Sequence, residues 1–264
     1  MQKKLVTLTT DFGSRDPYVA EMKAAILSIS PEATIVDVTH EIAKFNIRMG
    51  AYALASAAPY FPKGTIHVAV VDPGVGTRRR PILIQTQLGF FIGPDNGLLI
   101  SAAEHQGITS VHEIANTKLM LQRVSNTFHG RDVFAPAAAH LANGVSPDEV
   151  GPEVRDIVKP DFTKVTLEKG MLAGEVLHVD DFGNIITNIG EKQVERVRLA
   201  DIITVELAAK KLELRFCKAY SEVQPQEPLA LIGSHNYLEI AINQGNAARK
   251  FKVRPGEKVK LRLT

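Results

Sequence analysis

The first 150 residues alternate between two hydrophobic patterns. Apolar and β-branched runs predict strands, whereas apolar residues spaced three or four apart predict one face of a helix. The expected strands are 5–10, 34–38, 66–71, 81–85 and 89–92, and the expected helices begin after Asp16, with Pro17 in the first position, at Asn46 and at His129. This alternation predicts an N-terminal three-layer α/β/α domain.

Polar side chains follow the first three predicted strands. Asp11 ends the first, Asp37 and His40 lie at the end of the second, and Asp72 follows the third. The third strand is almost entirely apolar, which is typical of a parallel strand covered on both faces. Ligands of open α/β sheets bind outside the carboxyl ends of the strands, so we expect the functional site there.

The second part of the chain has a different pattern. Short β-type runs are separated by Gly, Asn, Asp and Pro, which indicates an antiparallel β-barrel-like domain. The expected strands are 172–179, 184–189, 202–207, 212–217, 229–232, 237–242 and 258–263, with one short helix at 191–197. We therefore expect an α/β fold with an N-terminal domain over 1–160, a polar linker and a C-terminal β domain over 170–264.

Composition narrows the function classes. The 264 residues carry 31 basic and 29 acidic side chains, a net charge of +2, so no overall field favours nucleic acid or an anionic membrane as a partner. The single cysteine, Cys217, excludes an intramolecular disulfide and a multi-cysteine metal site. No apolar run approaches the roughly 20 residues of a membrane span. These features favour a soluble, cytoplasmic protein.

The stretch from Asp72 to Arg80 combines several features of a ligand site. The strand before it directs Asp72 to the sheet edge, Gly74 and Gly76 permit close backbone approach, and three arginines follow. We expect Arg79 to point inward and its two arginine neighbours to be solvated. A simple turn followed by a basic surface run remains the alternative.

His129 stands where a helix is expected to begin. The positive end of a helix dipole lowers the pKa of a histidine, which would keep His129 neutral and able to accept a proton or a hydrogen bond. The alternative is a capping histidine beside a local ion pair between Arg131 and Asp132. The runs 93–97, 180–184 and 233–237 are each interpreted as turns.

Common nucleotide and metal signatures are missing from the sequence. It contains neither a GxGxxG after the first strand nor a GxxxxGK[ST] run, which disfavours a Rossmann methyltransferase and a P-loop enzyme. A metal site could be assembled from Asp11, Asp37, His40, Asp72 and His129, but no ligand spacing supports it. We therefore expect no metal.

Six motifs, taken in order, resemble one known family. They are Thr9 to Gly13, Asp72 to Thr77, Gly93 to Gly97, Phe128 to Asp132, Asp180 to Thr187 and Gly233 to Asn243. Together they resemble the adenosine-forming S-adenosyl-L-methionine hydrolases, also called SAM hydroxide adenosyltransferases, which are relatives of fluorinase and chlorinase. The resemblance implies a homotrimer whose site lies where the N-terminal domain of one subunit meets the C-terminal domain of the next.

The resemblance also implies which residues act. The family's catalytic Asp, Arg and His match Asp72, Arg79 and His129. The substrate-binding positions match Asp11, Phe45, Asp72, Asp180, Phe182, Asn184, Tyr220, Ser234, Glu239 and Ile242, the last through its backbone. Of these, Asp11 is expected on the ribose hydroxyls and the ring of Phe182 on the purine.

The implied reaction converts S-adenosylmethionine and water to adenosine and methionine. The leaving group departs as a neutral thioether, so a positioned water is needed but no general acid, metal or redox cofactor. We hypothesise that Asp72, Arg79 and His129 activate this water; Arg79 cannot be the base, and Asp72 or His129 can accept the proton.

Three other functions remain open on the sequence. A halogenase is disfavoured because Asp72 would repel a halide, and the related halogenases have an uncharged residue there. A nucleoside-binding protein without turnover and a metal-dependent phosphohydrolase are the other two alternatives.

Overall fold

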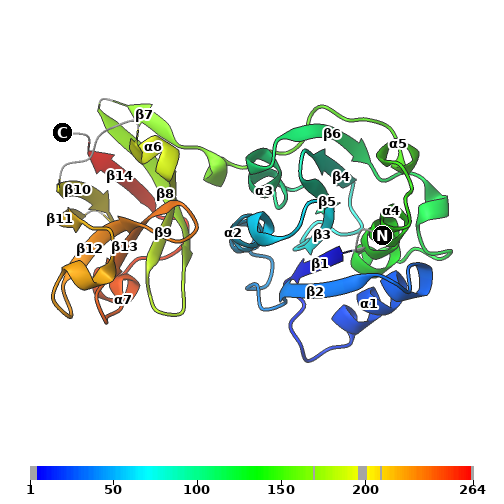
Figure 1. Ribbon diagram of the computed structural model, residues 1–264, viewed down its shortest axis with the longest axis horizontal. Coiled ribbons are helices and arrows are strands. Elements are labelled where there is room, and N and C mark those ends of the chain that lie inside the picture. The colour runs from blue at the N-terminus through cyan, green and yellow to red at the C-terminus, as the bar shows by residue number, and fades with distance from the viewer. Residues whose placement is uncertain (1–4, 169, 196–200, 209, 263–264) are drawn as a thin grey trace. The chain divides into compact units, whose positions relative to one another are not determined.

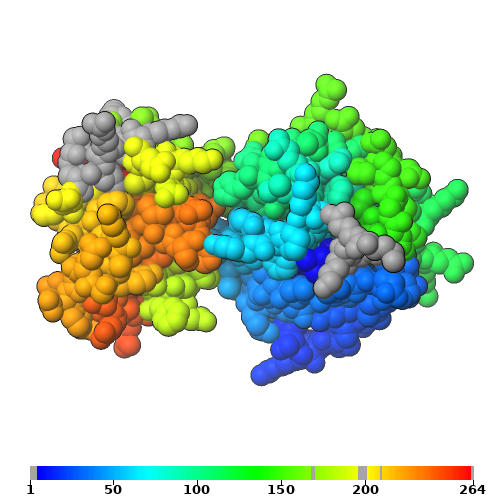
Figure 2. Space-filling view, in the orientation of Figure 1, coloured from blue at the N-terminus to red at the C-terminus, as the bar shows by residue number. Residues whose placement is uncertain are grey.

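The chain forms two compact units. The computed structural model describes residues 5–168, 170–195, 201–208 and 210–262, and the chain divides into Met1–Lys159 and Pro160–Thr264 (Figure 1). Side chains fill the spaces between the ribbons of each unit (Figure 2). None of the helices within the described ranges has the length and apolar character needed to cross a membrane.

A mixed sheet forms the centre of the first unit. Its strands lie in the order β2-β1-β3-β5-β4-β6, where β2, β1, β3 and β5 are parallel and β4 is antiparallel to both of its neighbours. The strands are β1 (Leu5–Thr10), β2 (Thr34–Thr39), β3 (Thr65–Val70), β4 (Pro81–Thr86), β5 (Gly89–Pro94) and β6 (Ile108–Glu113). The predicted hairpin of 81–85 and 89–92 is confirmed.

Helices cover both faces of this sheet. Alternate residues of β3 face opposite ways, so Ile66 and Val68 pack in one core and Ala69 packs in another. The first core includes α1 (Tyr18–Ile29) and α4 (Ala135–Ala142), and the second includes α2 (Ile47–Ala57) and α3 (Ile100–His105). A short α5 (Pro147–Val150) follows. The predicted three-layer arrangement is confirmed.

Two helix starts differ in how they are capped. The Asn46 side chain accepts a hydrogen bond from the backbone N–H of Met49 at 3.0 Å, as expected for an N-cap. Asp16 does not cap α1, because Pro17 occupies the cap position and makes no side-chain cap bond. That expectation was wrong. Pro17 already has helical dihedral angles and takes the N-cap position, so Asp16 lies one residue before the cap and is exposed.

The helix predicted from His129 begins with an unusual turn. Residues Gly130–Phe134 form a π-helical turn, with His129 in the N-cap position, and α4 continues from it. Gly144, just after α4, has a φ of 94°, a left-handed conformation that glycine adopts without strain. Wider π turns occur often at functional sites, where they re-aim side chains.

The second unit is a closed barrel. Among the described residues, seven strands close in the order β14-β10-β11-β12-β13-β9-β8, because β14 also pairs with β8. An eighth strand, β7 (Thr166–Glu168), extends β8 outside this ring. The ring consists of β8 (Met171–Val179), β9 (Ile185–Gly190), β10 (Ile202–Leu207), β11 (Lys210–Phe216), β12 (Pro228–Ile232), β13 (Tyr237–Ile242) and β14 (Lys258–Arg262).

The barrel prediction is confirmed, with two additions. Strands β11 and β12 are parallel rather than antiparallel, and a five-residue helix, α7 (Ala247–Phe251), precedes β14. Helix α6 spans Glu191–Glu195, and the rest of the helix predicted at 191–197 lies outside the described residues.

A histidine is buried inside the first unit. His67 on β3 is 1 % exposed, stacks on Phe91 at 4.9 Å between ring centroids, and contacts the Thr7 hydroxyl through Nδ1 at 2.8 Å. Burial lowers its pKa from the ordinary 6.5 to about 4. The folded protein therefore prefers this ring neutral.

We expect His67 to make the first unit less stable in mild acid. Between pH 6.5 and about 4 the unfolded chain binds a proton that the folded chain excludes, so the free energy of unfolding falls as pH falls, by up to about 1.4 kcal/mol per pH unit. Urea unfolding at several pH values should show a shallower loss for His67→Gln than for His105→Gln, whose exposed ring serves as the control. Equal slopes for the two variants would contradict this assignment.

Candidate active site

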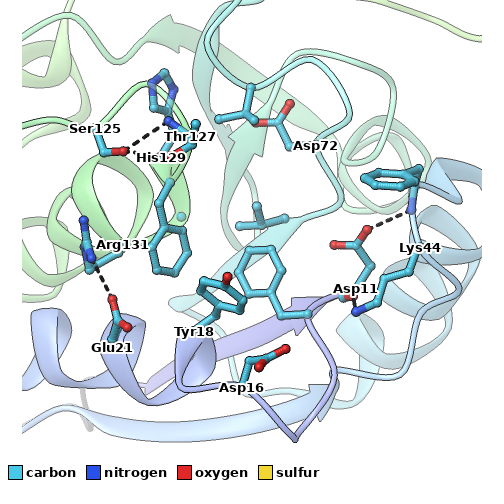
Figure 3. A pocket seen from close by; sticks show the side chains of 16 residues that line it. Asp11, Asp16, Tyr18, Glu21, Lys44, Asp72, Ser125, Thr127, His129 and Arg131 are labelled. Atoms are coloured by element: carbon cyan, nitrogen blue, oxygen red, sulfur yellow. Dashed lines mark hydrogen bonds and ion pairs between the residues drawn. The ribbon is translucent and has the colours of Figure 1, made fainter.

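A cavity of about 490 Å³ opens in the first unit, within the range of about 300–1,000 Å³ that is usual for small-molecule sites. It lies at the carboxyl ends of β1 and β3, as the sequence predicted. Its lining is drawn in Figure 3 and consists of Asp11, Phe12, Asp16, Tyr18, Glu21, Lys44, Phe45, Val70, Asp72, Val75, Ser125, Thr127, Phe128, His129, Gly130 and Arg131.

Arg79 joins the two polar groups that the sequence singled out. Its Nε donates to Asp72 Oδ1 at 3.0 Å and Oδ2 at 2.9 Å, and its Nη2 donates to Asp72 Oδ2 at 2.5 Å. The same Nη2 lies 2.8 Å from His129 Nδ1. Asp72 and His129 line the cavity, whereas Arg79 is not one of the lining residues. The guanidinium therefore lies behind the two groups and orients both.

This contact decides the protonation of His129. A guanidinium only donates hydrogen bonds, so Nδ1 must accept, and the neutral ring carries its proton on Nε2. The pKa of His129 is lowered by burial and by the charge of Arg79, although Asp72 and Asp132 act in the opposite direction. The predicted neutral state follows from these two causes, which outweigh the two carboxylates.

The ion pair of Asp72 and Arg79 is largely shielded from water. The Asp72 side chain is 5 % exposed and that of Arg79 is 9 % exposed, and the Arg79 guanidinium lies 5.4 Å from the centre of the Phe134 ring. Such a pair resists the loss of either partner, because the remaining charge would be buried without a counter-charge.

The neighbouring arginines have separate roles. Arg78 is exposed, as expected. The expectation that Arg80 is solvated was wrong: it donates to the buried Asp95 at 2.6 Å and to Asp156 at 2.8 Å. The predicted turn at 93–97 thus supplies Asp95 as the counter-charge of Arg80. The composition of the turn does not reveal this pairing.

Asp11 organises the opposite side of the cavity. It is 5 % exposed, its Oδ2 accepts the backbone N–H of Phe45 at 2.8 Å, and its backbone carbonyl accepts from the Lys44 ammonium. Figure 3 shows Asp11 and Lys44 side by side at this edge. Phe45 has a φ of 63°, rare for a bulky residue, and its side chain is 67 % exposed. The bond to Asp11 holds this strained backbone in place.

Three aromatic rings form an apolar part of the wall that the sequence did not predict as a unit. Phe12, Tyr18 and Phe128 meet edge to face, with ring centroids 5.2 to 5.9 Å apart. Phe12 follows Asp11 and Phe128 precedes His129 in the chain. Two of the rings therefore adjoin a predicted site residue, whereas Tyr18 does not, and only the tertiary structure brings the three together.

The lining also carries an excess of negative charge. It contains four carboxylates (Asp11, Asp16, Glu21 and Asp72) and two cationic side chains (Lys44 and Arg131). Arg131 pairs with Glu21, and Arg79 behind the wall pairs with Asp72, so the excess of negative charge rests on Asp11 and Asp16, against the single ammonium of Lys44. A ligand with positive charge and a flat or apolar body therefore suits this cavity.

Three predicted residues of the second unit lie in the turn of the β8–β9 hairpin. Asp180 accepts hydrogen bonds from the backbone N–H of Asn184 at 2.8 Å and from its side-chain amide at 3.0 Å. Phe182, between them, is 79 % exposed. Gly183 has a φ of 85°, and a Cβ there would lie 2.1 Å from the Asn246 side chain, so this turn requires glycine.

A second group lies on β13. Glu239 is 7 % exposed and accepts a hydrogen bond from the Tyr220 hydroxyl at 2.6 Å. Burial raises the pKa of Glu239, and the charge of Asp180 raises it further, so the two carboxyl groups lie within electrostatic reach. Ser234 lies exposed in the turn after β12, and the Ile242 side chain is buried at the end of β13.

The residues considered for a metal are engaged elsewhere. Asp37 accepts from Lys23 at 2.6 Å, and His40 Nδ1 contacts the Thr10 hydroxyl at 2.9 Å. Within the described ranges, no group of three or more His, Cys, Asp or Glu side chains is arranged to hold a metal ion.

Comparison with known families covers most of the chain. Residues 6–151 match the SAM hydroxide adenosyltransferase N-terminal domain, and residues 174–260 match the C-terminal domain of the same family. A (R)-S-adenosyl-L-methionine hydrolase of Methanocaldococcus jannaschii is 39 % identical over 94 % of this chain and 92 % of its own length. Another from Thermus thermophilus is 38 % identical over 97 % and 98 %.

A solved structure and a more distant relative also match nearly the whole chain. A crystal structure of an uncharacterized conserved protein from Thermotoga maritima has a TM-score of 0.88 and 37 % identity, covering 97 % of this chain and 99 % of that one. A fluorinase of an Actinoplanes species is less similar, at 28 % identity over 96 % of this chain and 95 % of its own length. By the match of both domains and by this identity along the chain, the protein belongs to the SAM hydroxide adenosyltransferase family.

Proposed function

We propose that this protein hydrolyses S-adenosyl-L-methionine to adenosine and L-methionine. The observation that carries the proposal is the Arg79 guanidinium, which binds Asp72 and His129 together at the wall of a cavity of suitable size. The names of its relatives, at 36 to 39 % identity, support the same substrate.

The charge of the cavity supports a sulfonium substrate. The substrate brings a positive sulfur and an ammonium group, and the lining has more carboxylates than cations. The aromatic wall suits both the apolar part of the ligand and a cation, because ring faces attract positive charge. A neutral water approaches these carboxylates without repulsion, whereas an anionic nucleophile would be repelled by them.

In the proposed step, a water attacks C5′ of the ribose in line with the C–S bond. The C–O bond forms, the C–S bond breaks with its electron pair passing to sulfur, and the water proton goes to Asp72. We assign the proton to Asp72 because Arg79 occupies Nδ1 of His129, the only acceptor of that ring, whereas Asp72 Oδ1 accepts a single hydrogen bond from Arg79 and keeps a second lone pair. His129 then acts as a hydrogen-bond donor.

Arg79 contributes position and charge. It fixes the Asp72 carboxylate through both oxygens and holds His129 in one tautomer. Its positive charge also stabilises hydroxide character on the water as the proton leaves. The reaction needs no metal or redox cofactor, because methionine departs as a neutral thioether.

The remaining substrate contacts are assigned by matching family positions. Asp11 binds the ribose hydroxyls and Phe45 packs on the ligand. The buried Asp11 carboxylate supports the first role, and the exposed Phe45 ring, on a strained backbone at the cavity edge, supports the second. In the second unit Phe182 packs on the purine, and Asp180 with Asn184 binds near the methionine amine and adenosine.

Tyr220, Ser234, Glu239 and the Ile242 backbone complete the proposed pocket. The bonded pair of Tyr220 and Glu239, close to the charge of Asp180, supports a polar subsite on the barrel. Because the two units each carry part of the binding set, we propose a homotrimer in which unit 1 of one subunit and unit 2 of the next share each site. We place the protein in the cytoplasm, where its one cysteine, buried and free, would stay reduced.

The first test is the product. We expect purified, chelator-treated protein to form adenosine and methionine from S-adenosylmethionine at the same rate with and without chloride, as measured by chromatography. We also expect faster turnover of the (R) epimer at sulfur than of the (S) epimer, in keeping with the relatives' names. A 5′-halogenated adenosine would indicate a halogenase, activity lost with chelator a metal enzyme, and no product a binding protein.

The second test concerns the three catalytic groups. We expect Asp72→Asn and Arg79→Lys each to lower kcat by about 10²- to 10⁴-fold, because one removes the proton acceptor and the other cannot bridge two partners. Adenosine should still bind both variants in calorimetry. The wild-type rate should fall in acid as Nδ1 of His129 is protonated, at a pH below the ordinary 6.5 because its pKa is lowered. An unchanged rate for Asp72→Asn would refute the mechanism.

The third test concerns the shared site. Asp72→Asn impairs only unit 1, and Asn184→Ala impairs only unit 2. After the two inactive variants are unfolded together and reassembled, about a quarter of the sites in random trimers would combine two intact halves and regain activity. Trimers that assemble without any recovery would show that one chain supplies both halves of its site.

A further inference from the structure

A buried carboxylate beside the cavity has no part in the mechanism above. Asp132 lies in the π-helical turn, three residues after His129, and is 0 % exposed. It is not among the cavity-lining residues, so it touches no ligand there. A charge so deeply buried must be balanced by hydrogen bonds.

Those hydrogen bonds lead to the cavity wall. Asp132 Oδ2 accepts the backbone N–H of Ser125 at 2.7 Å, and its Oδ1 accepts Arg131 Nε at 2.6 Å. The Ser125 hydroxyl in turn contacts the Thr127 hydroxyl at 3.1 Å (Figure 3). Ser125, Thr127 and Arg131 all line the cavity. One carboxylate thus secures wall residues on both sides of His129.

The Arg131 side chain is fixed in the same way. Asp132 holds one edge of its guanidinium, and Glu21 on α1 accepts from Nη1 at 2.6 Å. The guanidinium lies 5.0 Å from the centre of the Phe128 ring, which belongs to the aromatic wall. The position of that ring therefore depends on the Asp132–Arg131–Glu21 cluster.

The segment held by Asp132 also touches the loop that bears Asp72 and Arg79. A Cβ at Gly76 would lie 2.4 Å from the Asn126 carbonyl oxygen, so the two backbones are in close contact. Gly76 has a φ of 76°, which suits glycine. The loop of 72–79 and the segment of 125–129 thus meet twice, here and at the Arg79–His129 bond.

We propose that Asp132 is a positioning residue for catalysis: by anchoring the 125–128 segment and Arg131, it holds His129 in register with Asp72 and Arg79. This inference rests on the proposed function, because it names a further residue for the same reaction. It assigns Asp132 no contact with substrate.

The chain offers a matched control in Asp95. This carboxylate is also buried, accepts two guanidinium hydrogens of an arginine, Arg80, and accepts one backbone N–H, that of Val158 at 2.9 Å. It does not line the cavity, and neither do its two partners. Asp95 and Asp132 therefore make the same kinds of bond in different places.

The experiment compares Asp132→Asn with Asp95→Asn in the full-length protein. Both changes should lower the melting temperature, because each removes the charge of a buried carboxylate that binds a partly exposed arginine. At a temperature where both variants are folded, we expect Asp132→Asn to lower kcat at least tenfold and Asp95→Asn to leave kcat within twofold of wild type. The proposal is overturned if Asp132→Asn, folded, keeps kcat within twofold, or if both variants lose kcat equally.

A second measurement does not require turnover. The ¹⁵N chemical shifts of the His129 ring report which nitrogen carries the proton. We expect the Nε2–H form in wild type and in Asp95→Asn, and a mixture of tautomers in Asp132→Asn, because His129 would lose its alignment with Arg79. Identical His129 spectra in all three proteins would contradict the positioning role, even if the wild type formed no adenosine and the proposed function failed.

Asp132→Asn should fold, since Arg131 is 34 % exposed and keeps Glu21 as its partner. Should it not, Asp132→Ser provides the second variant, being smaller and too short to reach both Ser125 and Arg131. The same tenfold loss of kcat is expected, and full activity of this variant would overturn the proposal.

Discussion

Arg79 is the group on which the candidate site depends. It is a cation with little access to water, and the Asp72 carboxylate compensates its charge through both oxygens. Its remaining bond reaches His129, which must then accept and stay unprotonated at Nδ1. A single guanidinium thus sets the charge, tautomer and separation of the two side chains that face the cavity. A lysine could supply the charge but not these directions.

The fold provides the rigid frame that this arrangement needs. Asp72 follows β3, which is buried on both faces between two helical layers, so its backbone has little freedom. His129 stands at the start of a π-helical turn that is tied to α1 through Arg131 and Glu21. Catalytic groups held to a few tenths of an ångström on regular elements perform better than groups on free loops. The buried Asp132 carboxylate likewise fixes Ser125, which lines the cavity close to His129 in the chain.

Membership of a family with both hydrolase and fluorinase relatives makes the nucleophile the central chemical question. In the proposed mechanism, a cavity lined by more carboxylates than cations, with Asp72 beside the attacking water, favours a neutral water over a halide. The same environment favours the proposed reaction, because water attack on a sulfonium gives two neutral products and one proton. Asp72 accepts that proton in the proposed mechanism. The barrel contributes a separate polar group around Glu239, whose raised pKa reflects its burial and the charge of Asp180.

The sequence by itself determined the class of fold and the residues at the strand ends. Periodicity is local, so the alternating strands and helices of the first unit and the short strands of the second could be read from it, as could the placement of Asp11 and Asp72. The inward direction of Arg79 was also predicted. The neutral state of His129 was predicted from a helix dipole, whereas burial and the charge of Arg79 are the causes in the structure.

Only the tertiary structure decided how these pieces meet. The parallel pairing of β11 with β12, the three aromatic rings, the Arg80–Asp95 pair and the anchoring of Ser125 by Asp132 all join residues through folding rather than through local pattern. The π-helical turn and the failure of Asp16 to cap α1 show the same limit. Hydrophobic spacing specifies which face of an element is buried, whereas its partner is chosen by packing and hydrogen bonding across the whole chain.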